Sequence, residues 1–174
     1  MSEQLADEGV AVAFGQRLAN SHAFTQLFRD GMSLVEETAD YLAGAGRLES
    51  RQLPRNASLA YATESMRLTT RLMQIASWLL LHRAVKEGEI SLAQASKEKS
   101  KVKLSVGVPP DDQTMQLLPQ KLRELIARSW QITERVRRFD HNMYAPPPSE
   151  QVLLDNPVGR QLGMLKAAFE QNRR

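Results

Sequence analysis

The sequence contains no cysteine, and it has only two tryptophans, three tyrosines and five phenylalanines among 174 residues. The lack of cysteine excludes disulfide bonds, thiolate zinc sites, iron–sulfur clusters and a cysteine nucleophile. The apolar run of residues 78–81 is far shorter than the ~20 residues that cross a bilayer. The first residues also lack the basic start and apolar stretch of a secretory signal. We therefore expect a cytoplasmic protein without membrane contact.

The charge is modest but unevenly distributed. The formal net charge is +3, yet residues 1–50 hold eight acidic against three basic side chains. This asymmetry favours contacts between the two halves at least as much as contact with nucleic acid. Hydrophobic residues make up 42% and charged residues 25%, which is typical of a soluble globular domain. The length predicts one domain that can bury a real core.

The first half of the chain predicts two helices. One begins after Ser21, a good N-cap, and ends at the glycines of residues 44–46. A longer one runs from Asn56 or Ser58 to Lys86, and Gly88 is placed to end it. Its apolar residues cover about half of the circumference, so we expect it at the centre of the fold. They are Leu68, Leu72, Met73, Ile75, Ala76, Leu79 and Leu80. A stripe that we expect to be solvated, with Glu64 paired to Arg67, consists of Glu64, Arg67, Arg71 and Gln74.

The second half predicts a short helix and a long one. Ser91 and Gln94 form a capping box, which predicts a short polar helix over residues 92–103. After the prolines at 109 and 110, a long helix should run from Met115 or Pro119 to Tyr144. Its apolar stripe is Leu118, Leu122, Leu125, Ile126, Ser129, Ile132, Val136, Phe139 and Met143. Three long amphipathic helices without a strand pattern predict an all-α fold.

We therefore expect three parts: an N-terminal segment over residues 1–20, an antiparallel three-helix bundle with a short extra helix over residues 21–145, and a flexible tail. Three prolines at 146–148 end the bundle, because they favour an extended chain. Within the Pro-rich linker and C-terminal tail of residues 146–174, Leu162, Leu165 and Phe169 recur on one helical face. This short amphipathic helix is typical of segments that bind a groove on a partner. The alternatives are that this segment is a terminus without a role, or that it docks onto its own bundle.

Residues that could carry chemistry are scarce. The histidines are His22, His82 and His141, and no two have metal-ligand spacing, so we expect each at the surface or rim. The glycines at 44 and 46 follow a helix instead of a strand and lack the lysine of a phosphate-binding loop. No serine lies in a nucleophile motif. We therefore expect no catalytic site, no cofactor and no metal.

The more informative residues lie near the end of the second long helix. Trp78, Leu81 and Val85 share one side, with His82 beside them, where the face that carries Arg67 turns apolar. Either another part of the chain covers this patch, or it is an interface with a partner or a second copy, in which tryptophan is a frequent hot spot. We take Trp78, Leu81, His82 and Val85 as candidate partner-binding residues, together with Leu162, Leu165 and Phe169 of the tail.

A basic cluster on the last helix gives an alternative function. Arg135, Arg137 and Arg138 could bind phosphates, as in a small DNA-associated regulator. Glu134 interrupts the cluster, the three side chains spread over a wide arc, and no helix-turn-helix is evident. Nucleic acid is therefore not the expected partner. A hydrolase or transferase is a more distant alternative, which would need a pocket with converging polar groups.

Two stretches carry a resemblance to a known family. They are Tyr61-Ala-Thr-Glu-Ser-Met-Arg-Leu-Thr-Thr-Arg-Leu-Met-Gln-Ile-Ala-Ser-Trp-Leu-Leu-Leu and Phe28-Arg-Asp-Gly-Met-Ser-Leu-Val-Glu-Glu-Thr-Ala-Asp-Tyr-Leu. Over about residues 20–104 the chain resembles the alphaproteobacterial RcdA family, the regulators of CtrA degradation, and residues 64–78 are the most specific part. The last helix matches the family in its pattern of apolar and polar residues more than in residue identity.

The resemblance implies a function as well as a fold. It implies a three-helix bundle, often dimeric, with a mobile C-terminal tail, which is an adaptor for the ClpXP protease and not an enzyme. Such an adaptor joins a ClpXP complex primed by the response regulator CpdR and brings cargo or the co-adaptor PopA, so that CtrA is destroyed on time. Recruitment to the cell pole is a further implication. No family motif fixes individual contact residues in this sequence.

Overall fold

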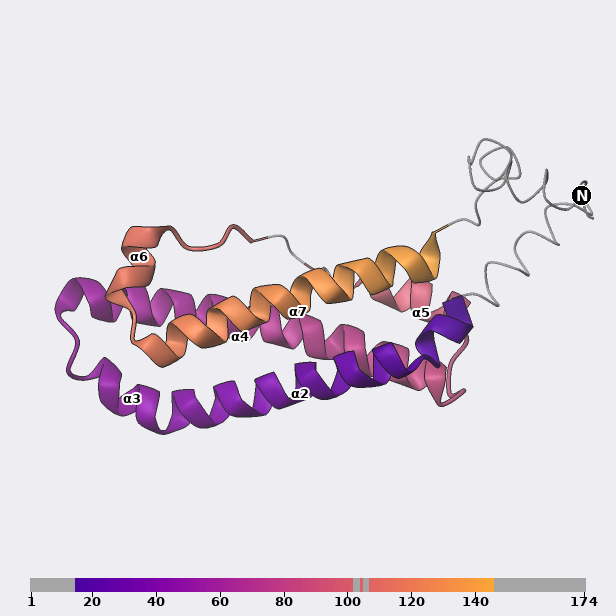
Figure 1. The fold of residues 1–174 in the computed structure, drawn as a ribbon, viewed down its shortest axis with the longest axis horizontal. Helices are drawn as coiled ribbons and strands as arrows, with labels where there is room; N and C mark the ends of the chain where they lie inside the picture. The colour runs from indigo at the N-terminus through magenta and orange to yellow at the C-terminus, as the bar shows by residue number, and fades with distance from the viewer. Residues whose placement is uncertain (1–14, 102–103, 105–106, 146–174) are drawn as a thin grey trace, which may run out of the picture. The chain divides into compact units, whose positions relative to one another are not determined.

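The computed structural model describes residues 15–101, 104 and 107–145. Its three long helices are α2 (His22–Ala43), α4 (Arg55–Lys86) and α7 (Gln120–Tyr144) (Figure 1). The shorter ones are α3 (Ala45–Ser50), α5 (Leu92–Lys99) and α6 (Asp112–Leu117), and residues 15–19 are helical too. The described part contains no strand. The long helices pack pairwise against one another, which confirms the predicted all-α three-helix bundle.

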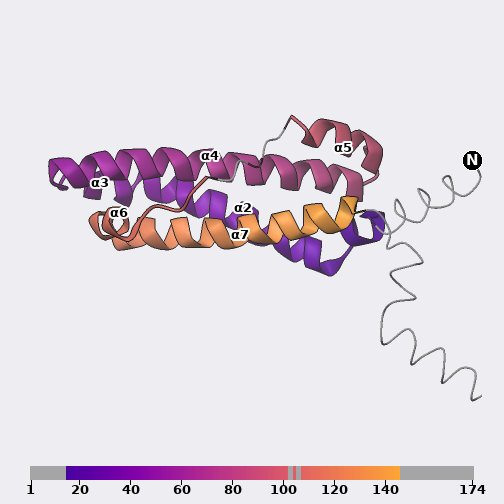
Figure 2. The same ribbon diagram turned by 90° about the horizontal axis from the view of Figure 1, so that it is seen from above.

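The three long helices do not simply alternate in direction. Arg71 of α4 hydrogen-bonds Ser129 of α7, and His82 of α4 lies against Tyr144 of α7. The two helices therefore run in the same direction. Asp30 pairs with Arg135 and Glu37 with Lys121, so α2 runs against α7. The antiparallel prediction therefore holds for α2 with each neighbour, whereas α4 and α7 are parallel. α5 lies beside the C-terminal part of α4 and α6 beside its N-terminal part, as Figure 2 shows.

Local chemistry explains most of the helix ends. The Ser21 side chain accepts the amide N–H of Phe24 at 3.1 Å, and Ser91 and Gln94 complete the predicted capping box. Gly88, at φ +76°, adopts the left-handed conformation that ends α4. Gly44 ends α2 at φ −107°, outside the left-handed region, and the chain continues directly into α3. The predicted helix stop is thus right in position, but the short helix after it was not predicted.

The other boundaries differ from the prediction at α5 and α6, whereas α7 follows the second of its two predicted starts, Pro119. α5 ends at Lys99 instead of Lys103. α6 was not predicted; it begins because the Asp111 side chain accepts the N–H of Thr114 at 2.7 Å. α7 begins at Gln120, after Pro119.

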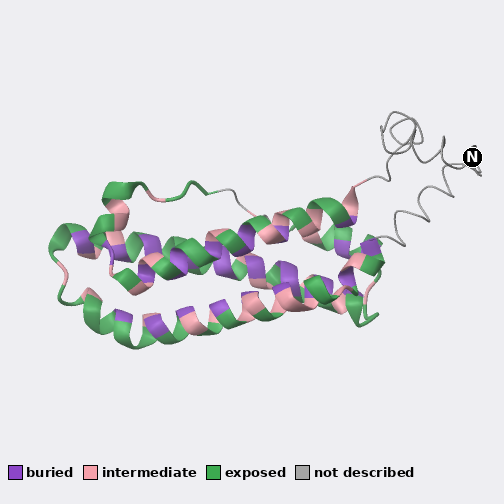
Figure 3. Ribbon diagram, viewed as in Figure 1, coloured by how far each residue is buried: buried purple, intermediate pink, exposed green. Residues whose placement is uncertain are grey.

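The core lies between the facing sides of the three long helices, where the buried residues line up along each helix (Figure 3). Gly31 of α2 sits where an added Cβ would lie 2.5 Å from Leu79 Cδ1, so glycine allows α2 and α4 to approach closely. The predicted stripe of α7 is confirmed, with only Phe139 partly exposed. The largest buried apolar side chains are Phe24, Leu27, Leu34, Leu68, Ile75, Trp78, Leu79, Val85, Leu122, Leu125 and Ile126.

Candidate functional site

Three of the four partner-binding candidates on α4 are internal. Trp78 is 1% exposed, His82 0% and Val85 2%, and only Leu81 is partly exposed. The chain itself therefore covers most of this patch, in line with the internal-packing alternative. Their partner-binding role stays a prediction, and it cannot depend on direct contact with the three buried side chains in this conformation.

A polar network runs through this end of the bundle. The Trp78 indole N–H donates to Asp140 Oδ1 at 2.9 Å, and Lys99 Nζ donates to both oxygens of the same carboxylate at 2.9 and 2.8 Å. The Lys99 ammonium also lies 3.8 Å from the centre of the Tyr144 ring. One carboxylate thus joins α4, α5 and α7.

His82 is the buried centre of this network, so the prediction that it lies at the surface or rim is wrong. Its Nδ1 is 2.8 Å from the Trp78 carbonyl, and its Nε2 is 2.8 Å from the Tyr144 hydroxyl. Because a carbonyl can only accept, Nδ1 carries the proton and Nε2 accepts from Tyr144. Burial lowers the pKa of His82, although the Trp78 carbonyl and Asp140 oppose the shift. The ring also stacks on Trp78 at 4.0 Å.

The tail begins at this network, because Tyr144 is the last residue of α7. Burial raises the pKa of the Tyr144 hydroxyl, so it stays a neutral donor to His82. The candidates Leu162, Leu165 and Phe169 lie outside the described residues.

The solvent face of α4 carries an apolar ridge that the sequence prediction missed. We define the ridge as Leu59, Met66, Met73 and Leu80, which are seven residues apart and 71%, 68%, 66% and 49% exposed. The expectation that Met73 and Leu80 lie in the core is wrong. Between Leu59 and Leu80 the rows beside the ridge are uncharged and small: Ala62, Thr69 and Ala76 on one side, and Thr63, Thr70 and Ser77 on the other.

The predicted solvated stripe of α4 is partly buried. Glu64 is 2% exposed and Arg71 8%, so the prediction is wrong for both, whereas Arg67 is exposed. Arg67 donates to Glu64 at 2.8 Å, which confirms the predicted pair. Arg71 donates to Ser129 at 2.8 Å and lies over the Trp130 ring at 3.9 Å. These residues face a cleft of about 740 Å³ between α4 and residues 107–114.

The basic cluster of α7 is largely neutralised within the chain. Arg135 donates to Asp30 of α2 at 2.6 Å, and Arg137 donates to Glu134 at 2.7 Å. The hydrogen bond from Arg135 is the main reason that the pKa of Asp30 lies below its usual range. Of the three predicted arginines, only Arg138 has no ion pair within the described part of the chain. No structural observation therefore favours the DNA-associated alternative.

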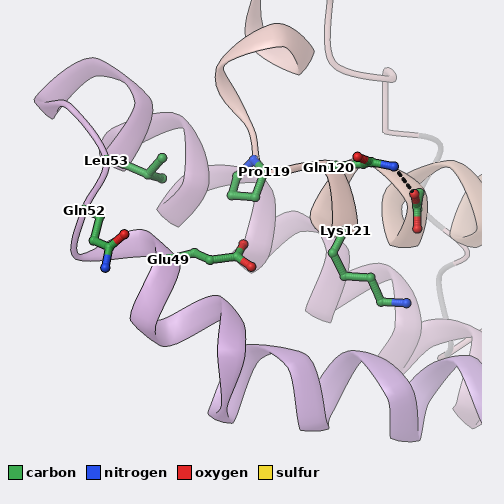
Figure 4. A pocket seen from close by; sticks show the side chains of 7 residues that line it. Glu49, Gln52, Leu53, Pro119, Gln120 and Lys121 are labelled. Carbon is green, nitrogen blue, oxygen red and sulfur yellow. Dashed lines mark hydrogen bonds between the residues drawn. The ribbon is translucent and has the colours of Figure 1, made fainter.

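A second pocket lies at the end of the bundle opposite the His82 network, where α3 faces the start of α7 (Figure 4). It has a volume of about 690 Å³, and its lining side chains include Glu49, Lys121 and Gln120, which donates to Glu124 at 2.9 Å. None of the lining residues is a serine, cysteine or histidine, so the pocket holds no nucleophile with an adjacent base.

Among the described residues, no group of three or more histidine, aspartate and glutamate side chains could hold a metal ion. No helix there is long and apolar enough to span a membrane. Together with the fold, these features define a helical-bundle protein whose described surface is distinguished by an apolar ridge and a cleft with buried charge.

Comparisons with known proteins identify the family. A model for the family described as "Protein of unknown function (DUF1465)" matches residues 15–169. The chain is 50% identical to RcdA in the crystal structure of RcdA from Caulobacter crescentus CB15, with a TM-score of 0.60 over 74% of this chain and 97% of that one. The chain belongs to this family, that of RcdA. Among curated proteins, none matches.

Proposed function

We propose that this protein is a non-enzymatic adaptor that delivers cargo or a co-adaptor to the ClpXP protease in the cytoplasm. The observation that carries the proposal is membership of the RcdA family, which rests on the family match over residues 15–169 and on 50% identity to RcdA. The apolar ridge of α4 adds that the protein has a surface for another protein chain. An exposed row of leucine and methionine lowers solubility unless another chain covers it, and methionine suits surfaces that bind proteins.

The proposed mechanism is tethering. An adaptor that holds a substrate beside the protease raises the local substrate concentration toward the millimolar range, which accelerates capture without any catalytic group. The family resemblance suggests CpdR as the priming partner, PopA as a co-adaptor, CtrA as the regulator that is degraded, and the cell pole as the place of recruitment.

We assign the ridge to a homodimer. In an antiparallel pair of α4 helices centred between Met66 and Met73, Met66 would face Met73 of the second copy, and Leu59 would face its Leu80. Large side chains spaced by seven residues, with rows of alanine, threonine and serine beside them, are self-complementary in the manner of a coiled coil. No like charges would meet at the centre, because Arg67 is already paired with Glu64.

The tail is the proposed delivery element. Leu162, Leu165 and Phe169 would form one face of a helix that binds a groove on the partner, joined to the bundle by a Pro-rich linker. Trp78, His82 and Val85 would then act indirectly, by fixing the end of α7 from which the tail leaves, and Leu81 would be the α4 candidate with partial access.

Removal of residues 146–174 tests the division of roles. The truncated protein should keep the helical content and unfolding midpoint of the bundle, measured by circular dichroism, and should lose stimulation of degradation by ClpXP. A full-length variant with Leu162, Leu165 and Phe169 changed to serine is the matched control, because it keeps the length of the tail. Unchanged stimulation by both proteins would contradict the role of the tail.

A further inference from the structure

The cleft beside the ridge contains a buried positive charge without a carboxylate partner. Six residues of α4 form one wall, from Thr63 to Arg71, and the segment 107–111 with Thr114 forms the other. Arg71 lies at its inner side, 8% exposed. Among the described residues, no carboxylate oxygen lies within 4.0 Å of the Arg71 guanidinium, which donates to the neutral hydroxyl of Ser129.

The nearest acid on α4 does not neutralise Arg71 directly. Glu64 accepts from Arg67 at 2.8 Å, so its charge is already matched by a more exposed cation. Burial lowers the pKa of Arg71, and Glu64 only partly opposes this shift. An arginine remains charged in proteins, so the cleft holds a desolvated cation that an anion would stabilise.

Trp130, which lies beneath the guanidinium, has an unpaired donor of its own. The Arg71 side chain lies 3.9 Å above the ring, and the Trp130 Nε1–H has no acceptor in the described part of the chain. Stacking on an aromatic ring holds the planar guanidinium in one orientation, which prepares it for bidentate pairing with a carboxylate.

The wall formed by residues 107–111 is apolar at the cleft entrance, which favours a protein ligand over a phosphate backbone. Val108 is 82% exposed on that wall, next to two prolines. Besides Arg67 and Arg71, the lining holds the carboxylates of Glu64 and Asp111, and this balanced set of charges does not suit a polyanion. An extended peptide can place one acidic side chain against Arg71 and an apolar neighbour against Val108.

We propose that the cleft binds an extended peptide segment that carries an aspartate or glutamate, with Arg71 as the partner of the carboxylate. The proposal rests on the proposed adaptor function and names the chemistry by which the adaptor recognises a protein that it carries. Arg71, stacked on Trp130, forms the polar floor of the site, and Val108 forms its apolar rim.

The test uses two fluorescein-labelled peptides, one in which leucine alternates with aspartate and one in which it alternates with asparagine. Fluorescence anisotropy with the full-length protein should show the aspartate peptide binding at least about tenfold more tightly, the effect expected of one charge-assisted pair. Arg71→Gln should abolish this preference, while Arg138→Gln, an exposed arginine of α7 outside the cleft, should preserve it.

A second pair of variants protects the test from loss of folding. Because Val108 is 82% exposed, Val108→Asp and Val108→Lys both leave the core intact and carry charges of opposite sign. The Val108→Asp protein should bind the peptide that contains aspartate more weakly than the Val108→Lys protein does. Equal binding of the two peptides, no saturable binding up to about 1 mM, or equal effects of both Val108 variants would overturn the proposal.

The proposal would also be overturned if a labelled single-stranded oligonucleotide competed with the aspartate peptide for binding to the cleft. The adaptor function itself is tested separately by ClpXP degradation. If the protein stimulates degradation but binds both peptides equally, the adaptor function holds and the peptide site is wrong. If it prefers the aspartate peptide but does not stimulate degradation, the peptide site holds and the adaptor function is wrong.

Discussion

The indole N–H of Trp78 donates to Asp140 Oδ1 at 2.9 Å, and this contact joins the central helix to the last turns of α7. The same carboxylate accepts from Lys99 of α5. The ring of Trp78 is 1% exposed and stacks on His82. A residue that the sequence offers as an interface anchor is therefore a structural one, and its contacts hold the point where the tail begins.

Substitution of Trp78 should separate packing from hydrogen bonding. Trp78→Ala should lower the free energy of unfolding by about 3–5 kcal/mol, because it leaves a large cavity in the core. Trp78→Phe keeps an aromatic ring but removes the donor to Asp140, and should cost about 1–2 kcal/mol. Urea unfolding measures both. If Trp78→Ala unfolded like the wild type, the assignment of this ring to the core would be wrong.

Protonation of His82 should destabilise the fold in mild acid. Burial lowers the pKa of His82 in the folded state, so the unfolded chain, with a pKa of about 6.5, binds the proton first. Stability is therefore complete above about pH 6.5, falls as the pH drops below this value, and stops falling at the lower folded-state pKa.

The control is His82→Gln, which can still accept from Tyr144 but cannot titrate. The wild type should lose more stability than this variant between about pH 7 and about pH 5, measured by urea unfolding at each pH. The exposed His22 and His141 are the same in both proteins. Parallel stability curves for the two proteins would refute the account of His82.

Charge on the ridge should dissociate the proposed dimer without unfolding the monomer. Met66→Asp and Met73→Asp each place a carboxylate opposite a methionine of the second copy, where it would be desolvated without a partner. Both methionines are exposed in the monomer, so the bundle should keep its helical content. Gln131→Asp, on the exposed face of α7, is the matched control. Sedimentation should show dimers for the wild type and the control, and monomers for the two ridge variants. A monomeric wild type at about 100 μM would contradict the assignment of the ridge.

Periodicity predicted the long helices well because their apolar stripes are regular. Leu122, Ser129 and Val136 lie on the buried side of α7 as their spacing requires, and the caps at Ser21 and Ser91 form. The short helices α3 and α6 were missed, since each has six residues and too few apolar positions to show a period. The parallel packing of α4 and α7 depends on where the long connection returns, which helical spacing does not encode.

The burial of α4 was harder to predict because this helix contacts partners on several sides. Periodicity assigned a broad apolar arc to the core, and Met73 and Leu80 at its edge are exposed. Conversely, Glu64, Arg71 and His82 look like surface residues by type, yet each is buried beside a specific partner. For Arg71 and His82 the buried partner is a residue of α7 that is more than 50 positions away in the sequence. The tail candidates lie outside the described residues and stay predictions.

The measurement that tests the central claim most directly is a degradation time course with purified ClpXP, the candidate cargo CtrA and CpdR, with and without this protein. The adaptor account predicts faster loss of cargo that saturates as the protein is added, with no loss in the absence of ClpXP. An unchanged rate with well-folded protein, primed protease and PopA present would contradict it.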